Sequence, residues 1–189
     1  MLPRTRHPIV LRRLRSADLA DFQAYRTDPK VGLYQGWLPM SDDDALAFLT
    51  KVESAPLLQP GHWTQIAIAS AEGGRLMGDI GLIVSAQQDR AEIGFTLAPI
   101  HQGQGIATHA ALEALDLLFE HTPVQQVIAV TDARNASSMR LLQRLGMTLV
   151  SSAEALFRGQ PCIEHTCVLE RVRRVAPGPW AGQGALAKG

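Results

Sequence analysis

The sequence contains little cysteine: in 189 residues, only Cys162 and Cys167 occur. They lie five residues apart in a segment whose pattern predicts a strand, so their side chains are expected to point to opposite faces. Neither a disulfide framework nor a zinc site is expected from such a pair. We therefore expect a cytoplasmic protein that binds no metal.

Long apolar runs are also absent. No stretch of about 18 consecutive apolar residues occurs, so we expect no membrane-spanning helix and no membrane partner. The segment Met1–Arg15 is rich in arginine and lacks both an apolar core and a cleavage site. It is therefore not expected to be a secretory signal.

The chain has no excess charge of either sign, because 18 Lys and Arg residues balance 18 Asp and Glu residues. A dedicated nucleic-acid binder normally carries a basic excess, so no direct nucleic-acid partner is expected, although a local basic patch stays open. A hydrophobic content of 46% with 19% charged residues is typical of a globular chain. A chain of this length buries roughly 70% of its unfolded surface and needs no disulfide or metal to fold.

Apolar periodicity predicts an α+β fold in one domain over residues 1–174, with residues 175–189 forming a Gly/Pro-rich tail. Two helices are expected to begin after the N-cap residues Ser16 and Ser41. The other expected helices are Gly105–His121 and Ala136–Leu145, and the expected strands are Ile9–Leu14, Gln65–Ala69, Asp79–Val84, Ala91–Leu97, Gln126–Val130, Thr148–Ala155 and Pro161–Glu170.

The most informative segment, Leu97–Thr108, runs from a strand through Gly103 and Gly105 into a helix. A helix that begins this way presents unpaired N–H groups and the positive end of its dipole, which together bind anions. Two spaced glycines also occur in turns without a function. A P-loop is excluded because no lysine follows Gly105, and a dinucleotide site is disfavoured by Thr108 and by the strand meander upstream. Another phosphate-bearing ligand is expected.

The pattern Gln102-x-x-Gly105-x-Ala107 resembles the acetyl-CoA signature of the GNAT superfamily of N-acetyltransferases, and Pro99 stands where that family usually has it. Downstream, residues 135–138 (Asn-Ala-Ser-Ser) and 145–147 (Leu-Gly-Met) resemble the second signature of the family. The segments 28–31, 36–39 and 91–95 are similar to the RimJ/RimL-like branch. The resemblance extends over roughly residues 8–172.

This resemblance implies a mixed, mostly antiparallel central sheet with helices on both faces and a splayed pair of parallel strands. It also implies acetyl-CoA as co-substrate and no metal. The acetyl group would pass to a primary amine, on a protein N-terminus or a small molecule, by direct attack in a ternary complex. The alternative is a non-catalytic acyl-CoA-binding module. A homodimer stays open as the assembly.

The resemblance also assigns cofactor-binding residues. Phe95 and Leu97 would offer main-chain groups to the pantetheine arm, and Asn135 would bond that arm or fix its loop. A helix cap is the alternative role for Asn135. The pyrophosphate would lie over the amides of the turn and the Thr108 hydroxyl. The turn residues are Gln102, Gly103, Gln104, Gly105, Ile106, Ala107 and Thr108.

Two catalytic residues are expected. Glu92 stands where many relatives have the base that deprotonates the amine, although a solvated carboxylate paired with an arginine is an equal alternative. Many relatives use a tyrosine beyond the last helix as the acid, but here the only tyrosines are Tyr25 and Tyr34, both far upstream. Ser138 is the proposed substitute, and a first-turn serine bonded to its own backbone is the alternative.

The remaining candidates belong to the acceptor side of the site, except His101, which lies beside the cofactor turn. Tyr34 and Trp37 would form a wall of the acceptor pocket, with a core position as the alternative for Trp37. His101 could contact phosphate but is more typical of an exposed loop. Asp42–Asp44 could attract a cationic amine, yet they are more typical of a capped first helical turn.

Overall fold

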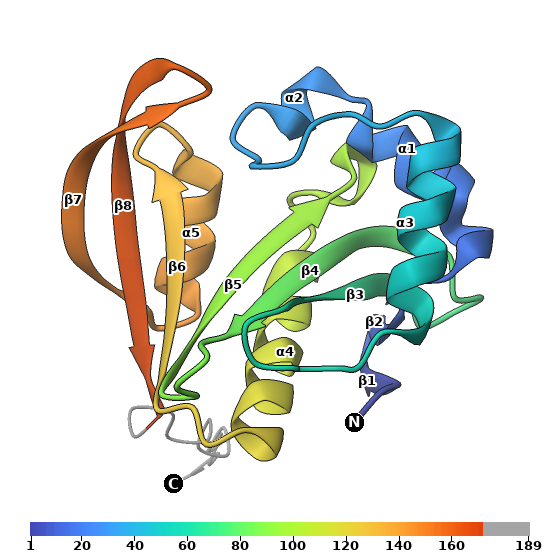
Figure 1. The fold of residues 1–189 in the computed structure, drawn as a ribbon, viewed down its shortest axis with the longest axis horizontal. Helices are drawn as coiled ribbons and strands as arrows, with labels where there is room; N and C mark the ends of the chain where they lie inside the picture. Colours follow the sequence, from blue (N-terminus) through green and yellow to red (C-terminus); the bar gives the residue numbers. More distant parts are fainter. Residues whose placement is uncertain (172–189) are drawn as a thin grey trace, which may run out of the picture.

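The computed structural model describes residues 1–171, and the expected tail, residues 175–189, lies outside them. Eight strands form one mixed sheet in the order β1-β2-β3-β4-β5-β6-β8-β7 (Figure 1). All neighbouring strands are antiparallel except β5 and β6. The strands are β1 Arg4–Arg6, β2 Ile9–Arg13, β3 Trp63–Ser70, β4 Leu76–Val84, β5 Arg90–Leu97, β6 Gln126–Asp132, β7 Thr148–Phe157 and β8 Gln160–Glu170.

Helices cover both faces of this sheet. On one face α4 (Ile106–His121) and α5 (Ala136–Arg144) contribute their apolar sides to a large core. On the other face α1 (Leu19–Arg26) and α3 (Asp42–Ser54) form a smaller core against β3 and β4. The short helix α2 (Pro29–Gly32) lies between the tops of the two sheet halves (Figure 1). The expected α+β architecture is confirmed.

The parallel pair is the feature that positions the site. β5 pairs with β6 only from Arg90 to Glu92, opposite Gln126 to Ile128, although β5 continues to Leu97. Beyond Glu92 the two strands diverge, and Figure 1 shows them separating toward the end of the sheet where α2 and the β7–β8 hairpin lie. The splayed pair of parallel strands is therefore confirmed.

Glycines occupy turn and helix-end positions whose backbone angles favour glycine. Gly103 and Gly105 adopt φ of 75° and 79°, values that favour glycine, and Gly105 is the N-cap residue of α4. Gly146 has φ 79° just beyond α5, as expected for a helix C-terminus. Ser41 accepts the Asp44 N–H at 3.1 Å, so the cap of α3 is confirmed.

Three local predictions differ from the structure. Ser16 is not an N-cap: its hydroxyl donates to Glu53, while the Asp18 carboxylate accepts the Arg15 N–H. The first helix also opens with a 3-10 turn, residues 16–18, before α1. Strand β1 and helix α2 were not expected, because three and four residues are too few to show a period.

Among the helices of residues 1–171, none combines the length and the hydrophobicity of a membrane-spanning segment. Both cysteines are free and buried.

Candidate active site

A cavity of about 710 Å³ opens where β5 and β6 separate. Its walls come from four parts of the chain: the end of β5, the glycine-rich turn with the start of α4, one side of α5 with the residue before it, and the segment that contains α2. The expected residues that line it are Tyr34, Phe95, Leu97, Gln102, Gly103, Gly105, Ile106, Ala107, Thr108, Asn135 and Ser138. Glu92, Gln104 and Trp37 do not line it.

The glycine-rich turn points its backbone at this cavity. The two left-handed glycines turn the chain into α4, whose 16 residues give the N-terminus a full dipole. The Gln102 N–H donates to the Pro99 carbonyl, and Thr108 and His109 donate theirs to the Gly105 carbonyl, so the N–H groups of residues 103–107 remain available for an anion. The Gln104 side chain turns away and donates to the Ile100 carbonyl at 2.8 Å.

The β5 edge of the cavity already holds two glutamine side chains. Gln102 Nε2 donates to the Leu97 carbonyl at 2.9 Å, which fixes the turn against the strand that precedes it. Gln35 Nε2 donates to the Phe95 carbonyl at 3.2 Å from the segment after α2. The two main-chain positions expected to meet the pantetheine arm therefore face the cavity, and amide donors reach both.

The start of α5 forms the opposite wall. Asn135 caps this helix, since its Oδ1 accepts the Ser138 N–H at 3.1 Å, and both residues line the cavity. The capping role expected as an alternative for Asn135 is thus present, in a residue that also faces the site. Ser138 is only 9% exposed.

Glu92 is the last residue of β5 that pairs with β6, so it lies at the base of the splay. Its neighbours Ala91 and Ile93 belong to the core under α4, which places the Glu92 side chain on the opposite face of the sheet. Burial raises the pKa of the Glu92 carboxyl, and the negative charge of Glu164 on β8 raises it further. A half-buried carboxylate with a raised pKa is suited to accept a proton.

The expected acceptor residues separate in the structure. Tyr34 lines the cavity, whereas Trp37 packs its ring on the Arg26 guanidinium, 4.4 Å from the ring centroid. Tyr25, the other tyrosine, is buried and donates to Asp79 at 2.6 Å. His101 lines the cavity. Asp42–Asp44 form the capped first turn of α3, with Gln23 donating to Asp42.

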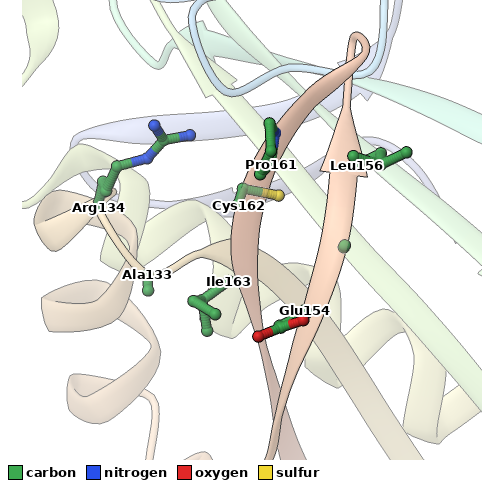
Figure 2. Close-up of a pocket in the computed structure, with 8 residues that line it drawn as sticks. Ala133, Arg134, Glu154, Leu156, Pro161, Cys162 and Ile163 are labelled. Atoms are coloured by element: carbon green, nitrogen blue, oxygen red, sulfur yellow. The ribbon is translucent and has the colours of Figure 1, made fainter.

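A second hollow, of about 940 Å³, lies on the β7–β8 hairpin beside Ala133 and Arg134. In Figure 2, Ile163 and Glu154 project from the hairpin toward Ala133, while Leu156 projects the other way. Leu156 is 73% exposed. None of the expected site residues lines this hollow, so the cavity at the splay is the candidate active site.

The comparison with protein families is decisive at this point. Residues 9–148 match the model described as "Acetyltransferase (GNAT) domain", which covers most of the chain. The chain belongs to the GNAT acetyltransferase family. Members of this family use acetyl-CoA.

Individual relatives are distant from this GNAT chain. An uncharacterized N-acetyltransferase, p20, of Bacillus licheniformis is 25% identical over 138 residues, covering 72% of this chain and 77% of the relative. A GNAT-family acetyltransferase structure from Bacillus anthracis superposes with a TM-score of 0.79 at 19% identity, covering 90% of this chain and 98% of the other. The Vibrio cholerae spermidine N-acetyltransferase, solved with CoA and spermine, gives 0.76 at 19% identity, covering 88% and 98%. These structural likenesses establish the fold.

Sequence reasoning missed the cations of the site. Lys30, Arg140 and Arg144 line the cavity of this GNAT domain, together with His109 and Gln35. The two arginines are four residues apart on α5, and this spacing predicts that they share a face of the helix. The spacing was visible in the sequence, but which face of α5 meets the turn depends on packing. Within residues 1–171, no group of three or more His, Cys, Asp or Glu side chains is arranged to hold a metal ion.

Proposed function

We propose that this GNAT protein transfers an acetyl group from acetyl-CoA to a primary amine by direct attack in a ternary complex. One observation carries the proposal. A single cavity brings together the N-terminal end of α4, the end of β5 that no longer pairs with β6, and the capped start of α5. Such a cavity offers an anion site for a pyrophosphate beside a strand edge at which an amide-bearing arm would take up or share the contacts that Gln35 and Gln102 now make.

Acetyl-CoA would be held mainly by backbone groups. The N–H groups of residues 103–107 and the α4 dipole would bind the pyrophosphate, with the Thr108 hydroxyl as a further donor, and Gln102 would hold the turn in place through its bond to the Leu97 carbonyl. The β5 edge near Phe95 and Leu97 would pair with the pantetheine arm, and Asn135 would contact the same arm from α5. Each of these groups except Gln104 belongs to a residue that lines the cavity.

The chemistry requires one proton to leave the amine. Glu92 would accept that proton, directly or through water, and the amine nitrogen would then attack the thioester carbonyl carbon. A C–N bond forms, the C–S bond breaks, and the electron pair leaves with the CoA sulfur. A thiol pKa of about 8.5 means that this thiolate leaves readily. Ser138 would therefore need only to donate a hydrogen bond to the leaving sulfur, without transferring its proton.

The acceptor and the branch of the family belong to the same proposal. Motif similarity to the RimJ/RimL-like branch supports a protein N-terminus as acceptor. The spermidine N-acetyltransferase, which shares the fold, supports a small amine. We propose a cytoplasmic site of action, since both described cysteines are free.

The test combines a binding measurement with a turnover measurement. Acetyl-CoA at 100 times its Kd should raise the free energy of unfolding by about 2.7 kcal/mol, which a thermal shift detects. Thiol release is then measured with a panel of amines that includes spermidine and peptides with free N-termini. Release with at least one amine supports the transferase.

Two other results would contradict the proposal. If a high concentration of acetyl-CoA produces no thermal shift, acetyl-CoA is not the co-substrate of this protein. A shift without thiol release on any amine would favour a non-catalytic acyl-CoA-binding module. That second function has one observation in its favour: α5 and the segment after it, to residue 171, contain no tyrosine.

A further inference from the structure

Residues 33–40, in the segment between α2 and α3, are hydrogen-bonded on one side to β5 and on the other side to the β7–β8 hairpin. On the β5 side, Gln35 Nε2 donates to the Phe95 carbonyl at 3.2 Å. On the other side, Arg158 at the tip of the β7–β8 hairpin donates Nη2 to the carbonyls of Gln35, at 3.1 Å, and Trp37, at 2.8 Å. The 33–40 loop is therefore tied to both diverging halves of the sheet, and Figure 1 shows the hairpin and this loop facing each other above the splay.

The middle of the 33–40 loop also rests on a rigid support. The Trp37 ring lies over the Arg26 guanidinium, and Arg26 is itself held by Asp79 of β4 through contacts of 2.9 and 3.0 Å. Arg26 and Asp79 are buried, so this support belongs to the core under α1. The contact from Arg158, by contrast, comes from an exposed hairpin tip 121 residues further along the chain.

We propose that Arg158 is a positioning residue, which holds the 33–40 loop in place beside the cavity and thereby fixes the wall, formed by Tyr34 and Gln35, against which the amine acceptor binds. This inference rests on the proposed acetyltransferase function. Tyr34 and Gln35 of the loop line the cavity together with the cofactor turn, so a displacement of the loop changes the shape of the site. A guanidinium suits this role because its planar array of N–H groups can serve two carbonyls at once.

The backbone of Arg158 makes clean variants possible. Arg158 has φ 50°, so alanine and lysine retain the backbone strain of the parent residue and change only the side chain. Arg158→Ala removes the donors, and Arg158→Lys keeps the charge and a flexible donor. Arg75→Ala is the matched control, because it removes an exposed guanidinium that bonds Asp21 on α1, and Arg75 does not line the cavity.

The first measurement reports the loop directly and needs no acceptor. In a Trp63→Phe/Trp180→Phe background, Trp37 is the remaining tryptophan of the chain. Acrylamide quenching of its fluorescence should increase about twofold or more in Arg158→Ala, increase less in Arg158→Lys and stay unchanged in Arg75→Ala. Equal quenching in all four proteins would overturn the proposal.

The second measurement uses steady-state kinetics with an amine that the panel identifies. KM for the amine should rise about tenfold in Arg158→Ala, the loss expected for hydrogen bonds from a charged donor, with partial rescue by Arg158→Lys. The thermal shift with acetyl-CoA should remain. An equal loss of cofactor and amine binding would overturn a positioning role in favour of a general structural one. If no amine is turned over, the transferase proposal fails, while the quenching result still decides the role of Arg158.

Discussion

At the scale of single residues, the carboxyl group of Glu92 combines a raised pKa with a position at the base of the splay. A base must be deprotonated to work, so kcat should rise with pH through the Glu92 pKa and then level off. The charge of Glu164 contributes to that raised pKa. Replacing Glu164 by Gln removes a like charge, which lowers the Glu92 pKa and should move the rising limb of the pH profile to lower pH.

The controls for this pH prediction lie on the same two strands. Glu92→Gln should lower kcat by about 10²–10⁴-fold and remove the limb, with the acetyl-CoA thermal shift intact. Glu170→Gln removes an exposed carboxylate at the far end of β8, bonded to Gln126, and should leave the limb in place. A limb that survives in Glu92→Gln would assign the proton transfer to another group.

Gly105 supplies a second prediction at this scale. Its φ of 79° lies in the left-handed region, where an added Cβ costs about 1–2 kcal/mol. Gly61 has φ 77° and open space around it, and it does not line the cavity. Gly105→Ala and Gly61→Ala should therefore lose similar amounts of stability in urea unfolding. Only Gly105→Ala should also weaken acetyl-CoA binding, because its Cβ enters the surface that the phosphates are proposed to approach. If both variants bind acetyl-CoA with equal affinity, the turn is not part of the binding site.

At the scale of secondary-structure elements, ion pairs attach β1 to α4. Glu113 of α4 accepts from Arg6 at 2.9 Å and from Arg4, and Arg4 also reaches the exposed Glu120. Burial opposes ionisation of Glu113, but the two arginines prevail and lower its pKa. Because its folded pKa is depressed, the stabilisation is present above the unfolded pKa and is lost as the pH falls through the folded value.

This ion-pair cluster predicts a graded loss of stability. Glu113→Gln should lower the free energy of unfolding by about 2 kcal/mol at pH 7, the range for hydrogen bonds to a charged group. Glu120→Gln should lower it by less than about 1 kcal/mol, since that pair is exposed. Urea titrations at pH 7 and pH 3 provide the measurement. The difference between parent and Glu113→Gln should shrink at pH 3, and a constant difference would show that charge is not the cause.

The same elements show what a sequence can and cannot predict. The expected strands Asp79–Val84 and Ala91–Leu97 and the expected helix Gly105–His121 correspond to β4, β5 and α4, because each contains six or more residues in an apolar pattern typical of its element. The prediction for Ser16 is wrong because its hydroxyl bonds Glu53, 37 positions along the chain, and the first turn begins after Arg15, whose N–H bonds the Asp18 carboxylate. The turn of the candidate site was predicted from residues close in sequence. Its cross-chain contacts were not, because Arg158 meets Gln35 across 123 positions, and no local pattern encodes such a pair.

At the scale of the whole molecule, a net charge of +0 coexists with a locally basic cavity. Arg140, Arg144 and Lys30 are exposed at its rim, around the positive end of the α4 dipole. Carboxylates of α4 that lie away from this rim, such as Glu113 and Asp116, are paired with Arg6. The cavity therefore presents positive charges to an anionic ligand, even though the net charge of the chain is zero.

Charge at the rim predicts how acetyl-CoA binding depends on salt. The Debye length falls from about 10 Å at 0.1 M to about 3 Å at 1 M, so rim arginines lose most of their attraction at high salt, while backbone amides in the turn lose little. The double variant Arg140→Gln/Arg144→Gln should bind acetyl-CoA about fivefold more weakly at low salt, at 0.2–1 kcal/mol per exposed pair. Titration calorimetry at several salt concentrations should show the curves of parent and variant converging, and Arg75→Gln should follow the parent throughout. If the acetyl-CoA affinities of variant and parent instead fall in parallel as salt rises, the two arginines contribute through packing and not through charge. The turn would then be the part of the site that attracts the phosphates.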